Sequence, residues 1–125
     1  MKVDDDVFVN PDNLWTTLES TKLHSVRLDH ANSFVNYALI GKTMVNIPPV
    51  RDLESKFYLP PSVYSPEVFP SYLQGLAYIL TGSLLQPIYS CTLRTPLIPF
   101  EDAFLTGLCA TQRLGLVLTH DSVSM

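Results

Sequence analysis

Two groups of acidic residues, near opposite ends of the chain, are the side chains best suited to chemistry. The first is the triplet Asp4, Asp5 and Asp6, and the second is the pair Glu101 and Asp102. Adjacent carboxylates repel one another unless a counter-charge arrives, and carboxylate oxygens are preferred ligands of hard divalent cations. A carboxylate at a helix start stays ionised and can accept a proton from a substrate. The triplet therefore predicts a metal site, and Asp102 a general base.

Each acidic group also has a purely structural explanation. Short acidic runs are commonest on exposed loops, so the triplet could lie in a solvated turn. A calcium loop opening at Asp4 is excluded, because it would need a Gly and a Glu where Val9 and Trp15 stand. Glu101 and Asp102 could simply complement a helix dipole. For the triplet, a metal site is favoured by the apolar, strand-forming residues on both sides of it.

The elements around the triplet are a predicted strand and a predicted helix. Residues 3–9 are mostly β-branched or aromatic outside the three aspartates, which indicates a strand. Asn10 and Pro11 then supply an N-cap and a first-turn proline, so a helix is expected from Pro11 to about Lys22. The apolar face of that helix would consist of Leu14, Trp15 and Leu18.

The acidic pair begins the last predicted helix. This helix should run from Glu101 to Leu114 and end at Gly115. Its buried side would consist of Phe104, Leu105 and Leu108. Ser83 and Gln86 form a possible capping box for a helix that continues to about Leu93.

The middle of the chain reads as strand and irregular structure. We expect a strand from Phe34 to Ile40 that ends at Gly41. Six prolines between Pro48 and Pro70 predict an irregular segment lying over one face of a sheet. Tyr72 to Thr81 is apolar and contains Gly75, which marks either a close approach by another backbone or a ligand, or a bulge.

Composition limits the class of protein. The chain has 125 residues, enough for one domain or part of one, and 46% of them are hydrophobic. Only 16% are charged, which suggests apolar surface that something else covers. The net charge of -4 argues against a nucleic-acid partner. The sequence contains no signal-peptide pattern and no apolar run of membrane-spanning length.

The cysteines and histidines form no motif. Cys91 and Cys109 lack metal-ligand spacing, and two cysteines are too few for a disulfide framework. Cys109 is expected to be a small core residue rather than a bridge or a nucleophile. His24 and His30 are expected at the surface or as satisfied core residues.

Four blocks of the sequence resemble the family of β-1,3-galactosyltransferases and β-1,3-N-acetylglucosaminyltransferases, known as glycosyltransferase family 31. Their order and spacing match that family over nearly the whole chain. The blocks are Lys2–Asn10, Pro49–Arg51 with Lys56–Tyr58, Phe69–Tyr72 leading to Gly75 and Tyr78, and Glu101–Gly107. The chain departs from the family in carrying Ala103 where Val is usual and a single glycine before Tyr78.

The resemblance implies an α/β, GT-A-like fold and an inverting enzyme that uses a divalent cation, usually Mn²⁺, and a UDP-sugar. Asp4 and Asp6 would hold the metal, with Asp6 as a direct ligand. Asp4 and Asp5 would also serve the donor, through its ribose, the metal's waters or the sugar. For this chemistry, the acidic triplet and the acidic pair must face a shared cleft.

The resemblance also assigns the second half of the site. Asp102 would be the base that deprotonates the acceptor's 3-hydroxyl, while Glu101 and Gly75 would contact substrate. The sugar transferred would be galactose or an N-acetylhexosamine, and the acceptor a glycan on a glycoprotein or glycolipid. A different reading is a truncated, non-catalytic relic or interaction module of the same fold.

By the same resemblance, residues 1–125 would be part of a catalytic domain, from the Asp-x-Asp strand to just past the Glu-Asp helix. The family's nucleotide-binding half, stem and membrane anchor precede that strand, and a metal-binding His follows the Glu-Asp helix. We therefore expect residues 1–125 alone to be inactive, and the complete enzyme to face the lumen from the Golgi membrane. His120 stands in a different context and is not expected to bind the metal.

Overall fold

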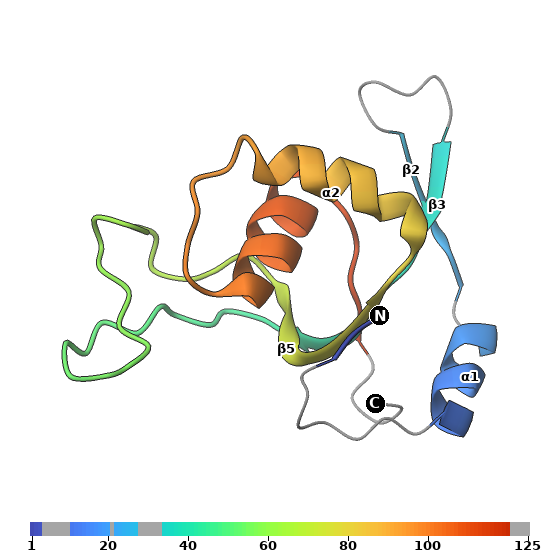
Figure 1. The fold of residues 1–125 in the computed structure, drawn as a ribbon, viewed down its shortest axis with the longest axis horizontal. Coiled ribbons are helices and arrows are strands. Elements are labelled where there is room, and N and C mark those ends of the chain that lie inside the picture. Colours follow the sequence, from blue (N-terminus) through green and yellow to red (C-terminus); the bar gives the residue numbers. More distant parts are fainter. Residues whose placement is uncertain (4–10, 21, 28–33, 121–125) are drawn as a thin grey trace.

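The computed structural model describes residues 1–3, 11–20, 22–27 and 34–120, which form a mixed α/β arrangement (Figure 1). In chain order its elements are β1 (Lys2–Val3), α1 (Pro11–Ser20), β2 (His24–Arg27), β3 (Phe34–Tyr37), β4 (Leu39–Met44), β5 (Tyr72–Leu80), η1 (Gly82–Leu84), α2 (Leu85–Thr92), η2 (Ala103–Arg113) and β6 (Thr119–His120). The α/β class expected from the sequence is confirmed.

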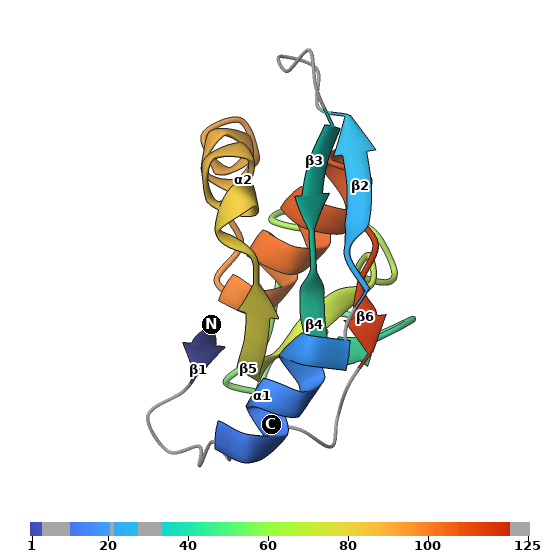
Figure 2. The same ribbon diagram turned by 90° about the vertical axis from the view of Figure 1, so that its right-hand side faces the viewer.

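The main sheet is small and mixed. Its strand order is β1-β5-β4-β6, with β5 antiparallel to both β1 and β4, and β6 parallel to β4. A separate antiparallel pair, β2 and β3, extends from one end of the sheet, and β3 leads directly into β4 (Figure 2). The strands β5 and β4 are therefore the two inner strands, and β5 is flanked by β1 on one side and β4 on the other.

The predicted strand from Phe34 to Ile40 was wrong in its limits. The chain forms two strands there, and β4 continues through Gly41 to Met44. A side chain at Gly41 would bring its Cβ to 3.1 Å from Cβ of Tyr78 on β5. This glycine therefore permits close contact between neighbouring strands instead of ending one.

The helices α2 and η2 pack together over β5 (Figures 1 and 2). The helix predicted between Glu101 and Leu114 is present, and Gly115 follows it with a φ of +67°. Its winding was not predicted, because η2 is a π-helix in which the Leu114 N–H donates to the carbonyl of Cys109. The expected buried side chains Phe104 and Leu108 are buried, and Leu105 is partly buried.

The capping box predicted for the preceding helix was wrong. The chain enters α2 through the short 3₁₀ turn η1, so Ser83 lies before the α-helix begins. The Ser83 hydroxyl donates to the carbonyl of Asn36, and the Gln86 amide donates to Ser90. Neither side chain caps the helix.

The proline-rich segment between β4 and β5 is irregular, as predicted, but it packs on η2 and not over a sheet face. Arg51 holds it together by donating to the carbonyls of Leu59, Tyr64 and Pro66. Its buried side chains share one core with the two helices. That core contains Leu59, Tyr64, Phe69, Cys91, Ile98, Ala103, Phe104, Leu108 and Cys109.

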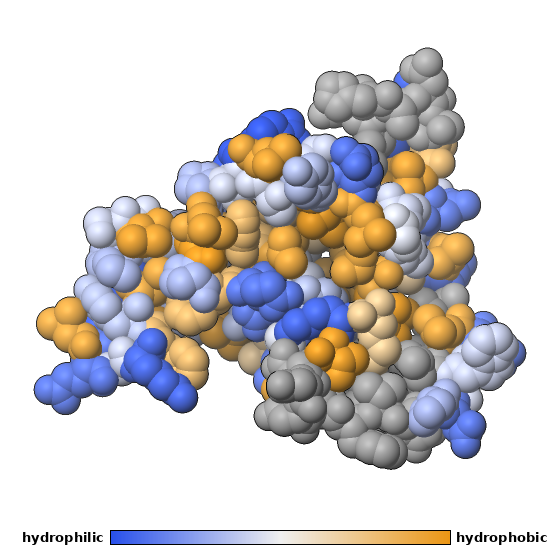
Figure 3. All heavy atoms as spheres, viewed as in Figure 1, coloured by the Kyte–Doolittle hydropathy of each residue, from blue (hydrophilic) through white to orange (hydrophobic). Residues whose placement is uncertain are grey.

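Much apolar surface is exposed. The helix α1 ends two residues earlier than predicted, and two side chains of its expected apolar face, Trp15 and Leu18, are 63% and 45% exposed. Hydrophobic residues also appear between polar ones across the face shown in Figure 3. In the described ranges, every helix is too short or too polar to cross a bilayer.

Candidate functional site

The predicted site residues that the structure describes meet at an irregularity in β5. On one side β1 pairs Lys2 with Tyr78. On the other side β4 pairs Gly41 with Tyr78 and then Thr43 with Leu73, so four residues of β5 lie opposite one residue of β4. Gly75 lies in this bulge. One of the two alternatives for the glycine is thereby confirmed.

Gly75 also permits a close approach, which was the other expectation for this glycine. The group that approaches its backbone is the carboxylate of Asp102. A Cβ there would lie 3.1 Å from Oδ2 of Asp102 and 3.3 Å from its Cβ. The Gly75 N–H donates to that same oxygen at 3.0 Å. The missing side chain is thus what allows Asp102 to bind the strand, and Gly75 contributes to the site through its backbone.

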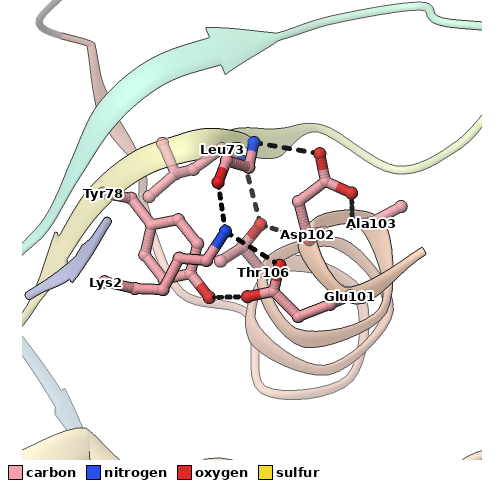
Figure 4. A network of polar contacts seen from close by, with 8 residues as sticks. Lys2, Leu73, Tyr78, Glu101, Asp102, Ala103 and Thr106 are labelled. Atoms are coloured by element: carbon pink, nitrogen blue, oxygen red, sulfur yellow. Dashed lines mark hydrogen bonds and ion pairs between the residues drawn. The ribbon is translucent and has the colours of Figure 1, made fainter. Parts of the chain in front are cut away.

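Asp102 is held by two backbone N–H groups. Besides the bond from Gly75, its Oδ1 accepts from the N–H of Ala103 at 2.8 Å, which caps the start of η2 (Figure 4). Asp102 thus has a structural role as the cap of the helix, and that role is compatible with chemistry. An ionised carboxylate has about four lone-pair sites, and two backbone donors leave room for a substrate hydroxyl. Burial raises the pKa of the Tyr72 phenol, and the nearby negative charge of Asp102 raises that pKa further.

Glu101 is held by side chains instead. Its Oε1 accepts from the Tyr78 hydroxyl, and its Oε2 lies 3.4 Å from Nζ of Lys2 (Figure 4). Lys2 also donates to the carbonyl of Gly75, and its Nζ lies 5.7 Å from the centre of the Tyr78 ring. The Glu101 side chain is 44% exposed, so one carboxylate is fixed in direction while remaining open to a ligand.

An apolar hollow adjoins Glu101. It has a volume of about 600 Å³ and is open to the surface. Its lining consists of Thr92, Leu97, Ile98, Pro99, Glu101, Phe104 and Leu105. Glu101 is the one charged side chain among these described lining residues, so a polar ligand group entering the hollow would meet that carboxylate.

Three helix side chains bond to the backbone around the start of β5. Asp102 accepts from Gly75, Thr106 accepts from the N–H of Leu73 at 2.9 Å, and Thr111 donates to the carbonyl of Ser71 at 2.8 Å. At 3.6 residues per turn, residues 102 and 111 would lie on opposite faces of a helix. The wider π winding, with about 4.4 residues per turn, brings all three to one face. The winding therefore positions Asp102 against the strand.

The metal prediction stays a prediction. Asp4, Asp5 and Asp6 lie outside the described residues, although β1 ends at Val3 and leads directly into them. Among the residues that are described, no three His, Cys, Asp or Glu side chains gather where they could hold an ion. That the triplet and Asp102 face a shared cleft likewise stays a prediction.

The two histidines that the structure describes, His24 and His120, make contacts away from Asp102 and Glu101. His120 lies on β6, at the opposite edge of the sheet from β1, and its Nδ1 accepts from the N–H of Thr43. His24 packs against Tyr37, with ring centres 5.6 Å apart. These contacts give both side chains a structural role, and the expectation that His120 does not bind the metal stays a prediction. His30 lies outside the described residues.

Sequence reasoning assigned no role to Lys2, Tyr78 or Thr106. Lys2 and Tyr78 belong to blocks that carry the family resemblance, but their pairing across β1 and β5 depends on strand register. Thr106 follows Asp102 by four residues, and its hydroxyl donates to the carbonyl of Asp102. That spacing was the available signal, because threonines commonly bond back by four residues in helices.

Comparisons with known proteins agree with the resemblance. The family model described as Galactosyltransferase matches residues 1–121. "Beta-1,3-galactosyltransferase 1" of Homo sapiens is 35% identical over 118 residues, which cover 93% of this chain and 32% of that protein. "UDP-GlcNAc:betaGal beta-1,3-N-acetylglucosaminyltransferase 7" of Rattus norvegicus is 35% identical over 86% of this chain and 24% of its own length.

A third relative shows the same partial coverage. "N-acetyllactosaminide beta-1,3-N-acetylglucosaminyltransferase 2" of Mus musculus is 36% identical over 93% of this chain and 26% of that protein. The chain thus spans about a third or less of the length of the curated relatives it matches.

Proposed function

The chain belongs to the galactosyltransferase family, and from that premise we propose that it supplies the acceptor-activating part of a glycosyl-transfer site. The protein would transfer galactose or an N-acetylhexosamine from a UDP-sugar to the 3-hydroxyl of a glycan on a glycoprotein or glycolipid. The reaction would invert the anomeric centre. The fold would be of GT-A type, and the complete enzyme would act on the luminal side of the Golgi membrane.

The observation that carries the proposal is the way Asp102 is held. Its carboxylate is fixed by the N–H groups of Gly75 and Ala103 at the start of a helix. The two donors use two of the roughly four lone-pair sites of the carboxylate and leave its capacity to accept a proton. The neighbouring carboxylate of Glu101 is fixed by Tyr78 and Lys2, so it can accept a hydrogen bond from a sugar hydroxyl.

In the proposed reaction, Asp102 removes the proton of the acceptor's 3-hydroxyl as that oxygen attacks the anomeric carbon of the donor. The bond between the anomeric carbon and the UDP oxygen breaks, and UDP leaves with the electron pair. Inversion follows because the oxygen attacks from the side opposite the leaving group. Glu101 would orient the acceptor or the donor sugar through one of its hydroxyls.

The acidic triplet fits the divalent cation that the family implies. All three side chains are carboxylates. Hard cations such as Mn²⁺ and Mg²⁺ prefer carboxylate oxygens as ligands, whereas softer metals prefer sulfur. Asp6 would be a direct ligand, Asp4 a second one, and Asp4 and Asp5 would also serve the UDP-sugar. When bound, the cation would neutralise the negative charge that develops on the departing diphosphate.

The test is turnover by the complete protein that contains this chain, purified from a secretory host. UDP release is measured with UDP-galactose, UDP-N-acetylglucosamine and UDP-N-acetylgalactosamine, with a glycan acceptor and Mn²⁺. We expect turnover with one of these donors, loss of turnover on chelation, and at least about a 100-fold loss in Asp6→Asn.

Asp52→Asn is the matched control, because Asp52 is an exposed aspartate in the irregular segment, where its side chain accepts the N–H of Glu54. This variant should turn over at the wild-type rate. If the complete protein folds but releases no UDP with any of the three donors, the proposal that it is an active glycosyltransferase is refuted. That result would favour the non-catalytic interaction module. Turnover that resists chelation and Asp6→Asn would refute the metal assignment alone.

A further inference from the structure

Two buried thiols meet behind the site, where α2 packs on η2 (Figure 1). Cys91 on α2 and Cys109 on η2 are both 0% exposed. Each sulfur lies beside the same hydroxyl, since Sγ of Cys91 is 3.5 Å and Sγ of Cys109 is 3.6 Å from Oγ1 of Thr95. Both sulfurs thus contact the same hydroxyl, and the Cys91 thiol is one of the neighbours that act on Cys109.

The Thr95 hydroxyl can serve both thiols at once. Its own proton is used in a 2.7 Å bond to the carbonyl of Cys91, which leaves two lone pairs on its oxygen, one for each thiol. Thiols are weak donors, and this shared bond contributes little to holding the two helices together. The pair is therefore placed mainly by packing of the surrounding core, and joining the two sulfurs requires an oxidant.

The native environment makes these thiols slow to react with outside reagents. Burial, together with the neighbouring Cys91 thiol, raises the pKa of Cys109 to about 11. A protonated, inaccessible thiol is a poor nucleophile. Any oxidation would therefore accompany folding, while the chain is still open to an oxidant.

We propose that Cys91 and Cys109 form a disulfide when the chain folds in an oxidising environment. The oxidant is a protein or small-molecule disulfide. One cysteine thiolate attacks it and releases one thiol, and the second thiolate then attacks the mixed disulfide and releases the other. The two cysteines lose two protons and two electrons, and the oxidant is reduced to two thiols.

The bridge would join α2 to the helix that presents Asp102. It closes a loop from residue 91 to residue 109, and Asp102 lies inside that loop. A closed loop of this length removes conformational freedom from the unfolded chain and stabilises the folded one. The inference rests on the two cysteines and Thr95, and it does not depend on the proposed activity.

The experiment is oxidative refolding of the full chain in a glutathione redox buffer. The expected result is an intact mass lower by about 2 Da than that of the reduced chain, with a peptide that links Cys91 to Cys109. Neither cysteine should then react with a maleimide under denaturing conditions until a reductant is added. The melting temperature should be about 10 °C higher in the oxidised protein than in the reduced one.

Cys91→Ala and Cys109→Ala serve as paired controls, each also measured with reductant to separate the cost of lost packing. Both variants should lose the dependence of melting temperature on redox state. Two maleimide-reactive cysteines in the refolded wild-type chain would overturn the proposal. A glutathione adduct on either cysteine, or a disulfide between two chains, would overturn it equally.

Discussion

The first turn of the last helix and the middle of that helix contact the same strand in different ways. At the first turn, Glu101 and Asp102 are held by hydrogen bonds and an ion pair with β1 and β5. In the middle, Gly107 lets the helix approach so closely that a Cβ there would lie 3.2 Å from Cβ of Tyr72. The first turn thus exposes fixed charge, whereas the middle is packed.

Because of this difference, we expect the first turn of the helix to serve activity and the middle of the helix to serve stability. Groups at the first turn keep spare hydrogen-bonding capacity and partial exposure, which a substrate would use. The middle has neither, and its side chains bury apolar surface or satisfy the backbone of β5. Substitutions at the first turn should therefore affect activity, and substitutions in the middle should affect folding.

The largest effect is expected from Asp102→Asn in the complete protein. Asparagine retains the shape but cannot accept a proton, so turnover of UDP-sugar should fall by about 1000-fold. Its amide would also face the N–H of Gly75 or Ala103, which should lower the melting temperature by only a few degrees. Asp52→Asn again serves as the control. If Asp102→Asn turns over at more than a tenth of the wild-type rate, Asp102 is not the general base.

The next largest effect is expected from Gly107→Val in the middle of the helix. The new side chain must displace Tyr72 or the backbone at Pro70, whose carbonyl lies 3.5 Å from the added Cβ. Overpacking of this kind should cost about 3 kcal/mol of unfolding free energy. Gly82→Val is the comparison, because a Cβ at Gly82 would meet no atom within 4 Å. Equal urea midpoints for the two variants would contradict close packing at Gly107.

The free energy of unfolding should depend on pH through Cys109, which lies in the middle of the helix. In the reduced protein the pKa of Cys109 is raised from 9.0 to about 11, so the folded state keeps a proton that the unfolded chain releases. Stability is therefore complete below pH 9 and is lost as the pH rises toward 11, by about 2 kcal/mol from this group.

Urea unfolding at a series of pH values measures this loss. Burial also raises the pKa of Tyr64 and Tyr72, which contributes a loss of the same sign, so Cys109→Ala provides the baseline. The variant should lose less stability than the reduced wild-type protein over this range. Identical pH profiles would show that Cys109 does not titrate with unfolding.

The smallest effect is expected from Lys2→Met at the first turn. Methionine keeps an apolar stem but removes the charge near Glu101, and a partly exposed ion pair contributes about 0.5 to 1 kcal/mol. Turnover should fall by about threefold to fivefold, while Lys2→Arg should restore most of it. A loss above about 100-fold in both variants would mean that the lysine contacts substrate directly, because Tyr78 still holds Glu101.

Local patterns in the sequence predicted the helices well. The proline after Asn10, the acidic pair before an apolar run and Gly115 placed helices where the structure has them, within about two residues. The strand end at Gly41 and the capping box at Ser83 were wrong. In both cases a contact with a distant residue, Tyr78 or Asn36, overrode the local signal.

The candidate site was only partly predictable. Asp102 and Glu101 follow from their place at a helix start, but the bonds to Gly75 and Lys2 depend on a strand register that no local pattern specifies. The contact of Cys91 and Cys109 with Thr95 is equally non-local. The proposed metal ligands Asp4 and Asp6 remain a prediction, based on residue type and family.

The π winding of η2 has a consequence for how this segment can vary. Three side chains reach the strand because residues 102, 106 and 111 are in phase with one another. Deleting one residue between them would shift that phase and turn Thr111 or Asp102 away, whereas a substitution elsewhere on the helix would not. The segment should therefore accept changes of sequence more readily than any change of length.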